Sequence, residues 1–325
     1  MRVTVVGAGV LGRIYGVRLA TAGEKVSFVV RPERVPEVGG HPQTPGETTP
    51  FVIEQVNGAR RCDVLERPER VTEIPRDTTA VLLTVRFDQL ARGNEELVGL
   101  LRRAPSVPLI VVTPMLPAPR ATVEKALGRR LTAAMPGAVG YLDERAVVRY
   151  WLTSVAPTLI EGDPKGGDGA GLDELLHRLG KAGLPAHRER DVGALNAATT
   201  TAFFPLVAAI DAGGGVDGIL ADRELLATVI DAAHECDTLG RKLGKVASWA
   251  HLLTRFVGPY TLKPAVTLAR RLAPEALRFA ESHFGPKLHA QHLAMGEDIL
   301  QIARGLGMPV PALEHLMDTL RARAA

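Results

Sequence analysis

Three glycines near the start of the chain have the spacing of a phosphate-binding loop, Gly7-Ala8-Gly9-Val10-Leu11-Gly12. In such a loop the first glycine permits a tight turn and the second lets the backbone approach a diphosphate. The third lets the following helix pack closely on a strand. The amides that open the helix, together with the positive end of its dipole, attract phosphate. Gly7, Gly9, Val10, Leu11 and Gly12 are therefore predicted to bind the diphosphate of a dinucleotide.

The residues about 20 positions further on decide which dinucleotide fits such a loop. A site for NADH places Asp or Glu at the end of the second strand, where the carboxylate binds the ribose 2′-hydroxyl. This sequence instead has Arg31 at that point and Arg34 shortly after it. A guanidinium pairs with a 2′-phosphate and cannot replace the carboxylate. NADPH is therefore the predicted cofactor, with Arg31 and Arg34 at its 2′-phosphate.

The glycine loop requires a strand before it and a helix after it, and the sequence predicts both. Residues 2–6 form an apolar run typical of a strand that is buried on both faces. Residues 11–21 have the apolar spacing of a helix, which Gly23 closes. A second strand at 25–30 completes a strand–helix–strand unit of about 30 residues. This context makes the motif more specific than its letters alone.

Strands continue to alternate with helices as far as residue 190, which predicts an α/β fold with a mostly parallel, doubly wound Rossmann sheet. The further predicted strands are 80–85, 109–113, 131–134, 146–152, 158–160 and 184–187. A helix is predicted at 172–182, and loops are predicted at 39–50 and 162–171.

From Asp191 onward strand signals end and long helical patterns follow. The predicted helices are 194–211, 223–243, 248–255, 273–283, 288–306 and 312–324. We therefore predict an NADP-binding Rossmann domain at 1–190 and an all-helical substrate or dimerisation domain at 191–325.

Bulk composition excludes several classes of protein. The chain has 325 residues, which suits two domains, and 46% of them are hydrophobic and 23% charged, as in soluble globular proteins. The net charge of +3 is not gathered into a basic track, so no nucleic-acid partner is expected. Cys62 and Cys236 have no metal-like or disulfide-like spacing. Without a signal peptide pattern or an apolar run of about 20 residues, we expect a cytoplasmic protein that does not contact membranes.

Three segments resemble one known family. They are GAGVLGRIYGVRLATAG and VVRPER within residues 1–34, VLLTVRFDQL at 81–90, and GLGMPVPALEHL at 305–316. These segments are similar to the ketopantoate reductase family, in which Lys usually stands at the position of Arg86. The resemblance implies a Rossmann domain and a helical domain with the substrate in the cleft between them. It also implies NADPH-dependent reduction of a 2-oxo acid to a 2-hydroxy acid, and it suits a homodimer formed through the helical domain.

The sequence departs from the family pattern at positions that the resemblance places near the cofactor and the substrate. Pro114 and Met115 stand where the family has an Asn-Gly pair, so Pro114, like Arg86, is predicted to lie beside the cofactor. Near the C-terminal end the family uses Glu to hold the substrate hydroxyl. The matching positions here are Gln291 and His292.

The family's catalytic lysine is also missing. The family places it early in the first helix of the second domain, with Asn one and two turns later, but no Lys occurs between Asp191 and Pro205. Counting back from Pro205 puts Asn196 at the lysine position and Thr200 at the first Asn. Counting forward from Asp191 points instead to Thr199.

Reduction of a ketone requires a proton donor for the developing alkoxide. Asn196, Thr199 and Thr200 can donate hydrogen bonds but are not acids near neutral pH. His292 can act as one, because imidazole titrates in that range. These four residues are the predicted catalytic set.

Three functions stay open at this point. The sequence favours an NADPH-dependent reductase that acts on a small carbonyl or imine substrate other than ketopantoate. The alternatives are ketopantoate reduction with an altered proton donor, and NADPH binding without turnover. A metal site made by His283, His289 and His292 lacks a supporting carboxylate spacing, so no metal is predicted.

Overall fold

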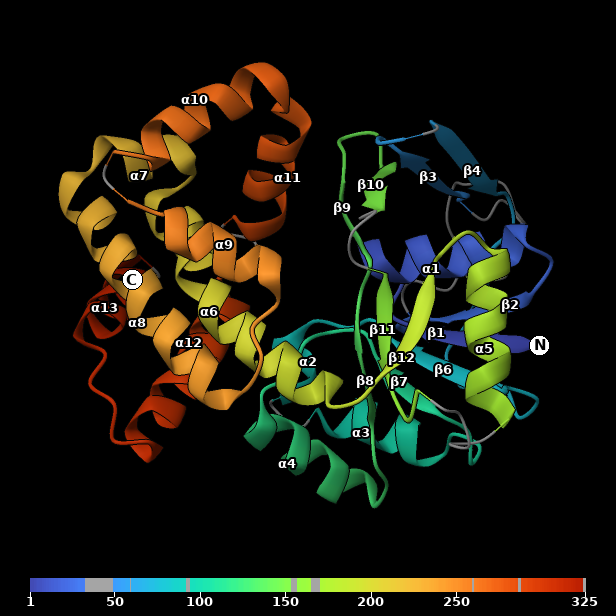
Figure 1. Cartoon of the computed structure of the whole chain (residues 1–325). Coiled ribbons are helices and arrows are strands. Elements are labelled where there is room, and N and C mark those ends of the chain that lie inside the picture. The colour runs from blue at the N-terminus through green and yellow to red at the C-terminus, as the bar shows by residue number, and fades with distance from the viewer. Residues whose placement is uncertain are drawn as a thin grey trace. The chain divides into compact units, whose positions relative to one another are not determined.

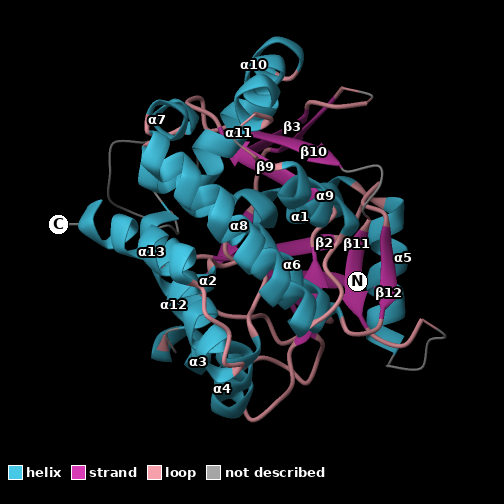
Figure 2. Cartoon of the chain, turned by 60° about the vertical axis from the view of Figure 1, so that its left-hand side comes forward, coloured by secondary structure: helices cyan, strands magenta, loops and turns pink. Residues whose placement is uncertain are grey.

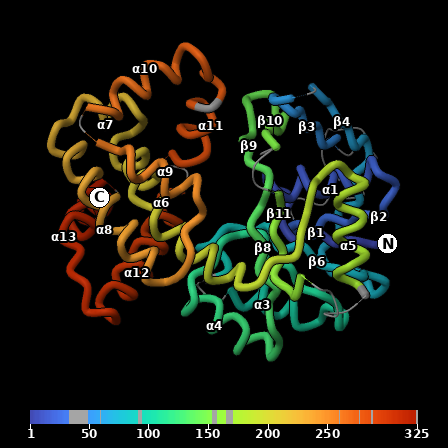
Figure 3. The backbone as a smooth tube through the Cα atoms, in the orientation of Figure 1, coloured from blue at the N-terminus to red at the C-terminus, as the bar shows by residue number. Residues whose placement is uncertain are grey.

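In the computed structural model the chain forms two compact units. The first unit comprises Met1–Met115 and Pro119–Val192, and the second comprises Leu116–Ala118 and Gly193–Ala325. Figure 3 shows the course of the backbone through each unit. The described residues are 1–32, 49–58, 60–91, 94–152, 157–164, 170–258, 260–285 and 288–323. Arg34 and most of the predicted loop at 39–50 lie outside these residues.

The first unit is built on an eight-stranded sheet of order β12-β11-β8-β7-β6-β1-β2-β5. The six strands from β5 to β8 are mutually parallel, and β11 joins β8 antiparallel. Their order reverses between β1 and β6, as in a Rossmann fold. The predicted fold class is confirmed. The strands are β1 (Arg2–Val6), β2 (Lys25–Val29), β5 (Glu69–Val71), β6 (Ala80–Leu83), β7 (Leu109–Val111), β8 (Thr132–Met135), β11 (Thr158–Glu161) and β12 (Ala186–Glu189).

The four-stranded sheet β4-β3-β10-β9 is a second layer that was not predicted, although one of its strands, β10, was predicted at 146–152. Helix α1 (Val10–Thr21) contacts β1 and β2 of the large sheet and all four strands of the small one. A helix enclosed on two sides is buried nearly all round, which explains why α1 has no strongly polar face. The small sheet consists of β3 (Phe51–Gln55), β4 (Arg61–Leu65), β9 (Ala138–Leu142) and β10 (Val148–Leu152).

Helices cover the large sheet on both sides. Figure 1 shows α1 on one side of the strands and α3 and α4 on the other. The helix α5 contacts α1 and β6. The bounds of these helices are α2 (Phe87–Ala91), α3 (Glu95–Arg102), α4 (Pro117–Leu127) and α5 (Ala170–Lys181).

The second unit is helical throughout the part of it that the structure describes, as Figure 2 shows. The long helix α8 packs against α13 and α9, and Asp222 caps its start by accepting hydrogen bonds from the amides of Glu224 and Leu225. Its helices are α6 (Val192–Gly213), α7 (Val216–Ala221), α8 (Arg223–Leu243), α9 (Ser248–Phe256), α10 (Leu262–Leu272), α11 (Pro274–Phe284), α12 (His289–Gly305) and α13 (Pro311–Arg323).

The helix α6 is the one helix among the described residues that is long and apolar enough, by length and composition, to cross a membrane. Most of its apolar window is buried inside the structure. Such burial is also the property of a core helix, so the helix is weak evidence for a membrane span.

Candidate cofactor site

The turn after β1 can be made only by a residue that tolerates a positive φ. Gly7 has φ +101°, a conformation that side-chain-bearing residues rarely adopt. Its amide donates a hydrogen bond of 3.1 Å to the carbonyl of Val29 in the neighbouring strand. The turn is thereby anchored to the end of β2.

Gly12 lets the first turn of α1 lie directly on this loop. A Cβ atom at Gly12 would lie 2.0 Å from the carbonyl oxygen of Gly7 and 2.7 Å from Oγ1 of Thr84. The Thr84 hydroxyl donates a 2.7 Å hydrogen bond to the same Gly7 oxygen. Thr84 was not predicted as a site residue, because the predicted strand at 80–85 contains it; in the structure β6 ends at Leu83 and Thr84 follows it, at the edge where the loop lies.

Gly9 has the opposite surroundings. A Cβ atom there would meet no described atom within 4 Å, so the glycine is not required by packing inside the protein. Gly9 is the N-cap of α1 and has no side chain with which to cap it, and the first turn contains no acidic residue. The amides of Val10, Leu11 and Gly12 have no partner within the helix. Helix-opening amides at a positive dipole end, beside the open space at Gly9, fit a diphosphate.

The other predicted cofactor residues follow neighbouring strands. Arg31 is exposed and comes two residues after β2. Arg86 follows β6, with its guanidinium 3.0 Å from the carboxylate of Asp88 and its side chain nearly half exposed. Pro114 is half-buried and follows β7. Because these strands are parallel, their carboxyl ends lie at one edge of the sheet, together with the glycine loop.

Two further arginines lie near the loop, and the sequence analysis did not identify them. The guanidinium carbons of Arg13 and Arg70 lie 4.5 Å and 5.0 Å from the ring centroid of Phe51. Arg13 also donates a 3.0 Å hydrogen bond from Nε to the carbonyl of Ala8 within the loop. Burial lowers the pKa of Arg70. The pair adds positive charge to a region predicted to bind phosphate.

The four predicted catalytic residues all lie in the helical unit. Asn196 is buried on α6. Thr199, one turn later, is also buried, and its hydroxyl oxygen accepts a 3.0 Å hydrogen bond from the amide of Ala247, directly before α9. Thr200 is half-buried. His292 is buried on α12. Of the four residues, Thr199 has the clearest structural role, because its hydroxyl binds the amide that precedes α9.

His292 belongs to a cluster with two other side chains. Its Nδ1 and the Nδ1 of His289 each lie 2.9 Å from the same oxygen, Oδ2 of Asp211 at the end of α6. The Asp211 side chain is fully buried. Burial alone would raise the pKa of Asp211, but the hydrogen bonds and positive charge of the two histidines outweigh it and lower the pKa. The carboxylate holds Nδ1 of both rings, and Nε2 of each ring is buried without a hydrogen-bond partner among the described residues.

The three histidines considered as metal ligands do not share one site. The ring of His283 stacks on Phe279, with 5.1 Å between the centroids, whereas His289 and His292 bind Asp211. Among the described residues no group of three His, Cys, Asp or Glu side chains is placed to hold a metal ion.

A family model matches the segment that forms the glycine loop and the first strands. The model, described as "Ketopantoate reductase PanE/ApbA", matches residues 3–57. This segment is similar to ketopantoate reductases. The predicted resemblance is therefore confirmed for this part of the chain. No curated protein matches the sequence.

Solved structures extend the likeness in fold to the whole chain. A PanE/ApbA family ketopantoate reductase from Ralstonia eutropha JMP134 has a TM-score of 0.68 at 20% identity, covering 99% of this chain and 98% of the other. A dimeric ketopantoate reductase from Staphylococcus aureus has a TM-score of 0.63 at 13% identity, covering 99% and 98%. A D-mandelate dehydrogenase solved with NADH has a TM-score of 0.57 at 14% identity, covering 99% and 98%. At these identities the likeness establishes the fold and leaves function to the site itself.

Proposed function

We propose that this protein is an NADPH-dependent oxidoreductase that reduces a small carbonyl compound resembling a 2-oxo acid, or an imine. The observation that carries the proposal is the open space at Gly9, before the helix-opening amides and at the point where the strand order of a Rossmann sheet reverses. Ligands of such sheets bind outside the carboxyl ends of the strands at this point. Similarity to ketopantoate reductases and to a D-mandelate dehydrogenase supports the same class of reaction.

The choice of NADPH rests on Arg31. It occupies the end of the second strand, where an NADH site would carry a carboxylate, and it is exposed. The amides of Val10, Leu11 and Gly12 would hold the diphosphate, and Arg31 and Arg86 would bind phosphate charge at the same edge. When bound, the nicotinamide supplies a hydride.

The substrate side lacks the family's lysine, so another group must provide the proton. His292 is the one member of the predicted catalytic set whose side chain, an imidazole, is an acid–base group. Asp211 holds its Nδ1, which orients the ring, as a carboxylate does for a catalytic imidazole. We therefore propose His292 as the proton donor, with Asp211 as the residue that positions it.

The cofactor proposal is tested by Arg31→Ala, with Kd for NADPH and NADH measured by calorimetry. Loss of a charge-assisted contact to the 2′-phosphate should weaken NADPH by about tenfold or more and leave NADH unchanged. Arg76→Ala is the matched control, because Arg76 is exposed and precedes β6, at the opposite edge of the sheet. An Arg31→Ala protein that binds NADPH as tightly as the wild type would remove Arg31 from the site.

Assays of NADPH oxidation distinguish the three candidate functions. NADPH oxidation is measured with ketopantoate, with a panel of other 2-oxo acids, and with cyclic imines. Oxidation with a member of the panel other than ketopantoate supports the proposal, and oxidation with ketopantoate supports the first alternative. Tight NADPH binding without oxidation on the whole panel supports the non-catalytic alternative. The homodimer and the cytoplasmic location stay predictions, the first of which light scattering can test.

A further inference from the structure

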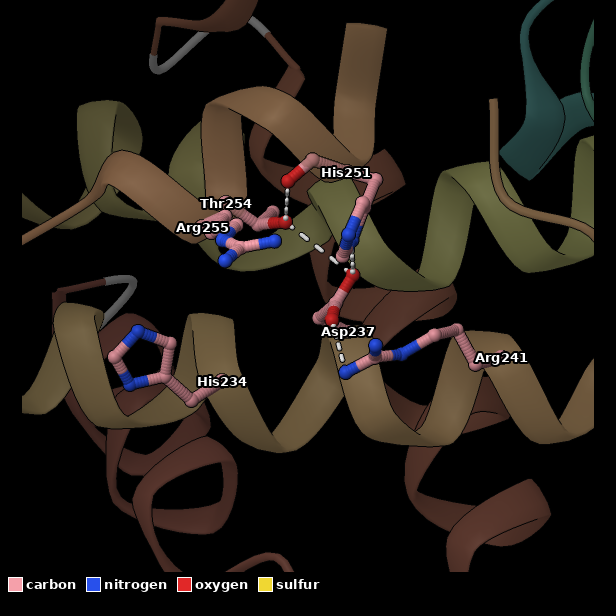
Figure 4. Close-up of a pocket in the computed structure, with 6 residues that line it drawn as sticks. All are labelled: His234, Asp237, Arg241, His251, Thr254 and Arg255. Atoms are coloured by element: carbon pink, nitrogen blue, oxygen red, sulfur yellow. Dashed lines mark hydrogen bonds and ion pairs between the residues drawn. The ribbon is translucent and has the colours of Figure 1, made fainter. Parts of the chain in front are cut away.

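A polar pocket lies between two helices of the second unit, and none of the residues that line it is predicted to bind the cofactor or to act in catalysis. It has a volume of about 240 Å³ and is lined by His234, Asp237, Arg241, His251, Thr254 and Arg255. Figure 4 shows these side chains on two helices, with Asp237 between His251 and Arg241.

The pocket arises from the spacing of polar residues on α8 and α9. His234, Asp237 and Arg241 are three and four residues apart on α8, and His251 and Arg255 are four apart on α9. Residues at these intervals share one face of a helix. Each helix therefore presents a row of basic side chains to the same space.

Asp237 organises the basic groups. The side chain is 9% exposed, and its oxygens lie 2.6 Å from Arg241, 3.0 Å from Nδ1 of His251 and 3.3 Å from the hydroxyl of Thr254. With its carboxylate engaged in this way, Asp237 has little capacity to bind a cation. The contact to Nδ1 leaves Nε2 of His251 on the far side of the ring.

Positive charge exceeds negative charge in the pocket. Two arginines line it against one carboxylate, and the two histidines can add to the excess. Arg255 and His234 are exposed, and no ion pair joins either of them to another described residue. Planar guanidinium groups match the geometry of carboxylate and phosphate oxygens.

We propose that this pocket binds a small oxyanion, meaning a metabolite that carries a phosphate or carboxylate group. Arg255 and His234 contact the anion directly, and Asp237 positions His251 and Arg241 around it. The volume admits a small metabolite and is below that of pockets for larger organic ligands. Every residue that lines this site lies in the helical unit, so the proposal does not rest on the predicted cofactor residues of the first unit.

The test uses the full-length protein and calorimetric titration with inorganic phosphate, succinate and chloride. We expect phosphate or succinate to bind at concentrations at which chloride does not. Arg255→Gln should weaken that binding by about tenfold, the loss typical of a charged hydrogen bond. His234→Gln should weaken it by a smaller factor. Phosphate binding without succinate binding would identify a phosphate site, and the reverse would identify a carboxylate site.

Arg223→Gln is the matched control. Arg223 is exposed at the start of α8, makes the same change of charge, and does not line the pocket. The proposal is overturned if neither oxyanion binds more tightly than chloride, or if Arg223→Gln weakens binding as much as Arg255→Gln. NADPH affinity should be the same in both variants, so failure of this site and failure of the cofactor site are distinguishable.

Discussion

Alanine at Gly9 should weaken NADPH binding with little effect on stability, whereas alanine at Gly12 should lower the stability of the fold. Gly9 has φ −75° and ψ −164°, which any residue adopts, and a methyl group there meets no described atom within 4 Å. Gly9→Ala should therefore change the free energy of unfolding by only about 1 kcal/mol, the cost of alanine at an N-cap. The new methyl group would, however, stand where a diphosphate must approach the amides. Affinity for NADPH should fall by about tenfold or more, equivalent to about 1.4 kcal/mol.

Gly12→Ala tests packing instead. Its methyl carbon would lie 2.0 Å from the carbonyl oxygen of Gly7, whereas carbon and oxygen normally stay about 3.3 Å apart. The obstacle is backbone, so the helix must move, at a cost of about 3 kcal/mol. For a unit of this size, that cost lowers Tm by about 6–12 °C.

The assay is thermal unfolding of the wild type and both variants, with and without NADPH, followed by calorimetric titration of the folded proteins. In the absence of NADPH, the Tm of Gly9→Ala should be close to that of the wild type, and adding NADPH should raise it only slightly. Gly12→Ala should melt lower under all conditions. If Gly9→Ala bound NADPH as the wild type does, the proposed path of the diphosphate would be wrong. If Gly12→Ala had the same Tm as the wild type, Gly12 would not be required for packing on Gly7.

Two further predictions concern buried titratable groups. Asp211→Asn should lose about 2–3 kcal/mol of stability at neutral pH, because the histidines lose a charged acceptor. The lowered pKa of Asp211 means that this stabilisation is present above the ordinary value of 3.8 and is lost as pH falls below it. Urea unfolding across this pH range should show that the difference in stability between the wild type and Asp211→Asn disappears in acid. A difference that persists there would refute the lowered pKa of Asp211. Burial raises the pKa of Tyr15 from 10.0 to about 12, against hydrogen bonds with Thr158 and Gly137. Between these values the unfolded chain releases a proton that the folded protein keeps, so stability should fall by about 1.4 kcal/mol per pH unit. Tyr15→Phe should be about 1 kcal/mol less stable at neutral pH and should show a shallower alkaline decline, and equal slopes would contradict this.

The sequence was sufficient to predict the elements whose patterns are strong. The buried strand at 2–6, the helix at 223–243 and the change to an all-helical second unit are all present in the structure. Each is a long periodic helix or a short continuous apolar run, for which local pattern and tertiary burial agree.

The small sheet was missed because its strands, apart from the one predicted at 146–152, carry mixed signals. In β4 the residues Cys62 and Val64 are exposed while Asp63 is buried, which inverts the usual alternation. Asp63 can be buried because Arg18 and Arg61 pair with it. When a charged residue is buried because residues elsewhere in the chain pair with it, the local sequence pattern does not predict its burial.

The same limit applies to the candidate sites. The spacing of His289 and His292 placed them on one helix face, but their partner Asp211 is 78 and 81 residues away along the chain. Thr84 and Arg70 were likewise brought to the glycine loop only by the fold, whereas Arg13 directly follows Gly12 in the chain. Sequence patterns found the residues of the loop itself, because these follow one another directly in the chain.

The central claim is that the amides opening α1 and the guanidinium after β2 together hold a phosphorylated dinucleotide. Calorimetric titration of the purified wild-type protein with NADPH and with NADH tests it most directly. We predict saturable binding of both, with NADPH at least about tenfold tighter because of its 2′-phosphate. Absence of NADPH binding, or tighter binding of NADH, would contradict the account.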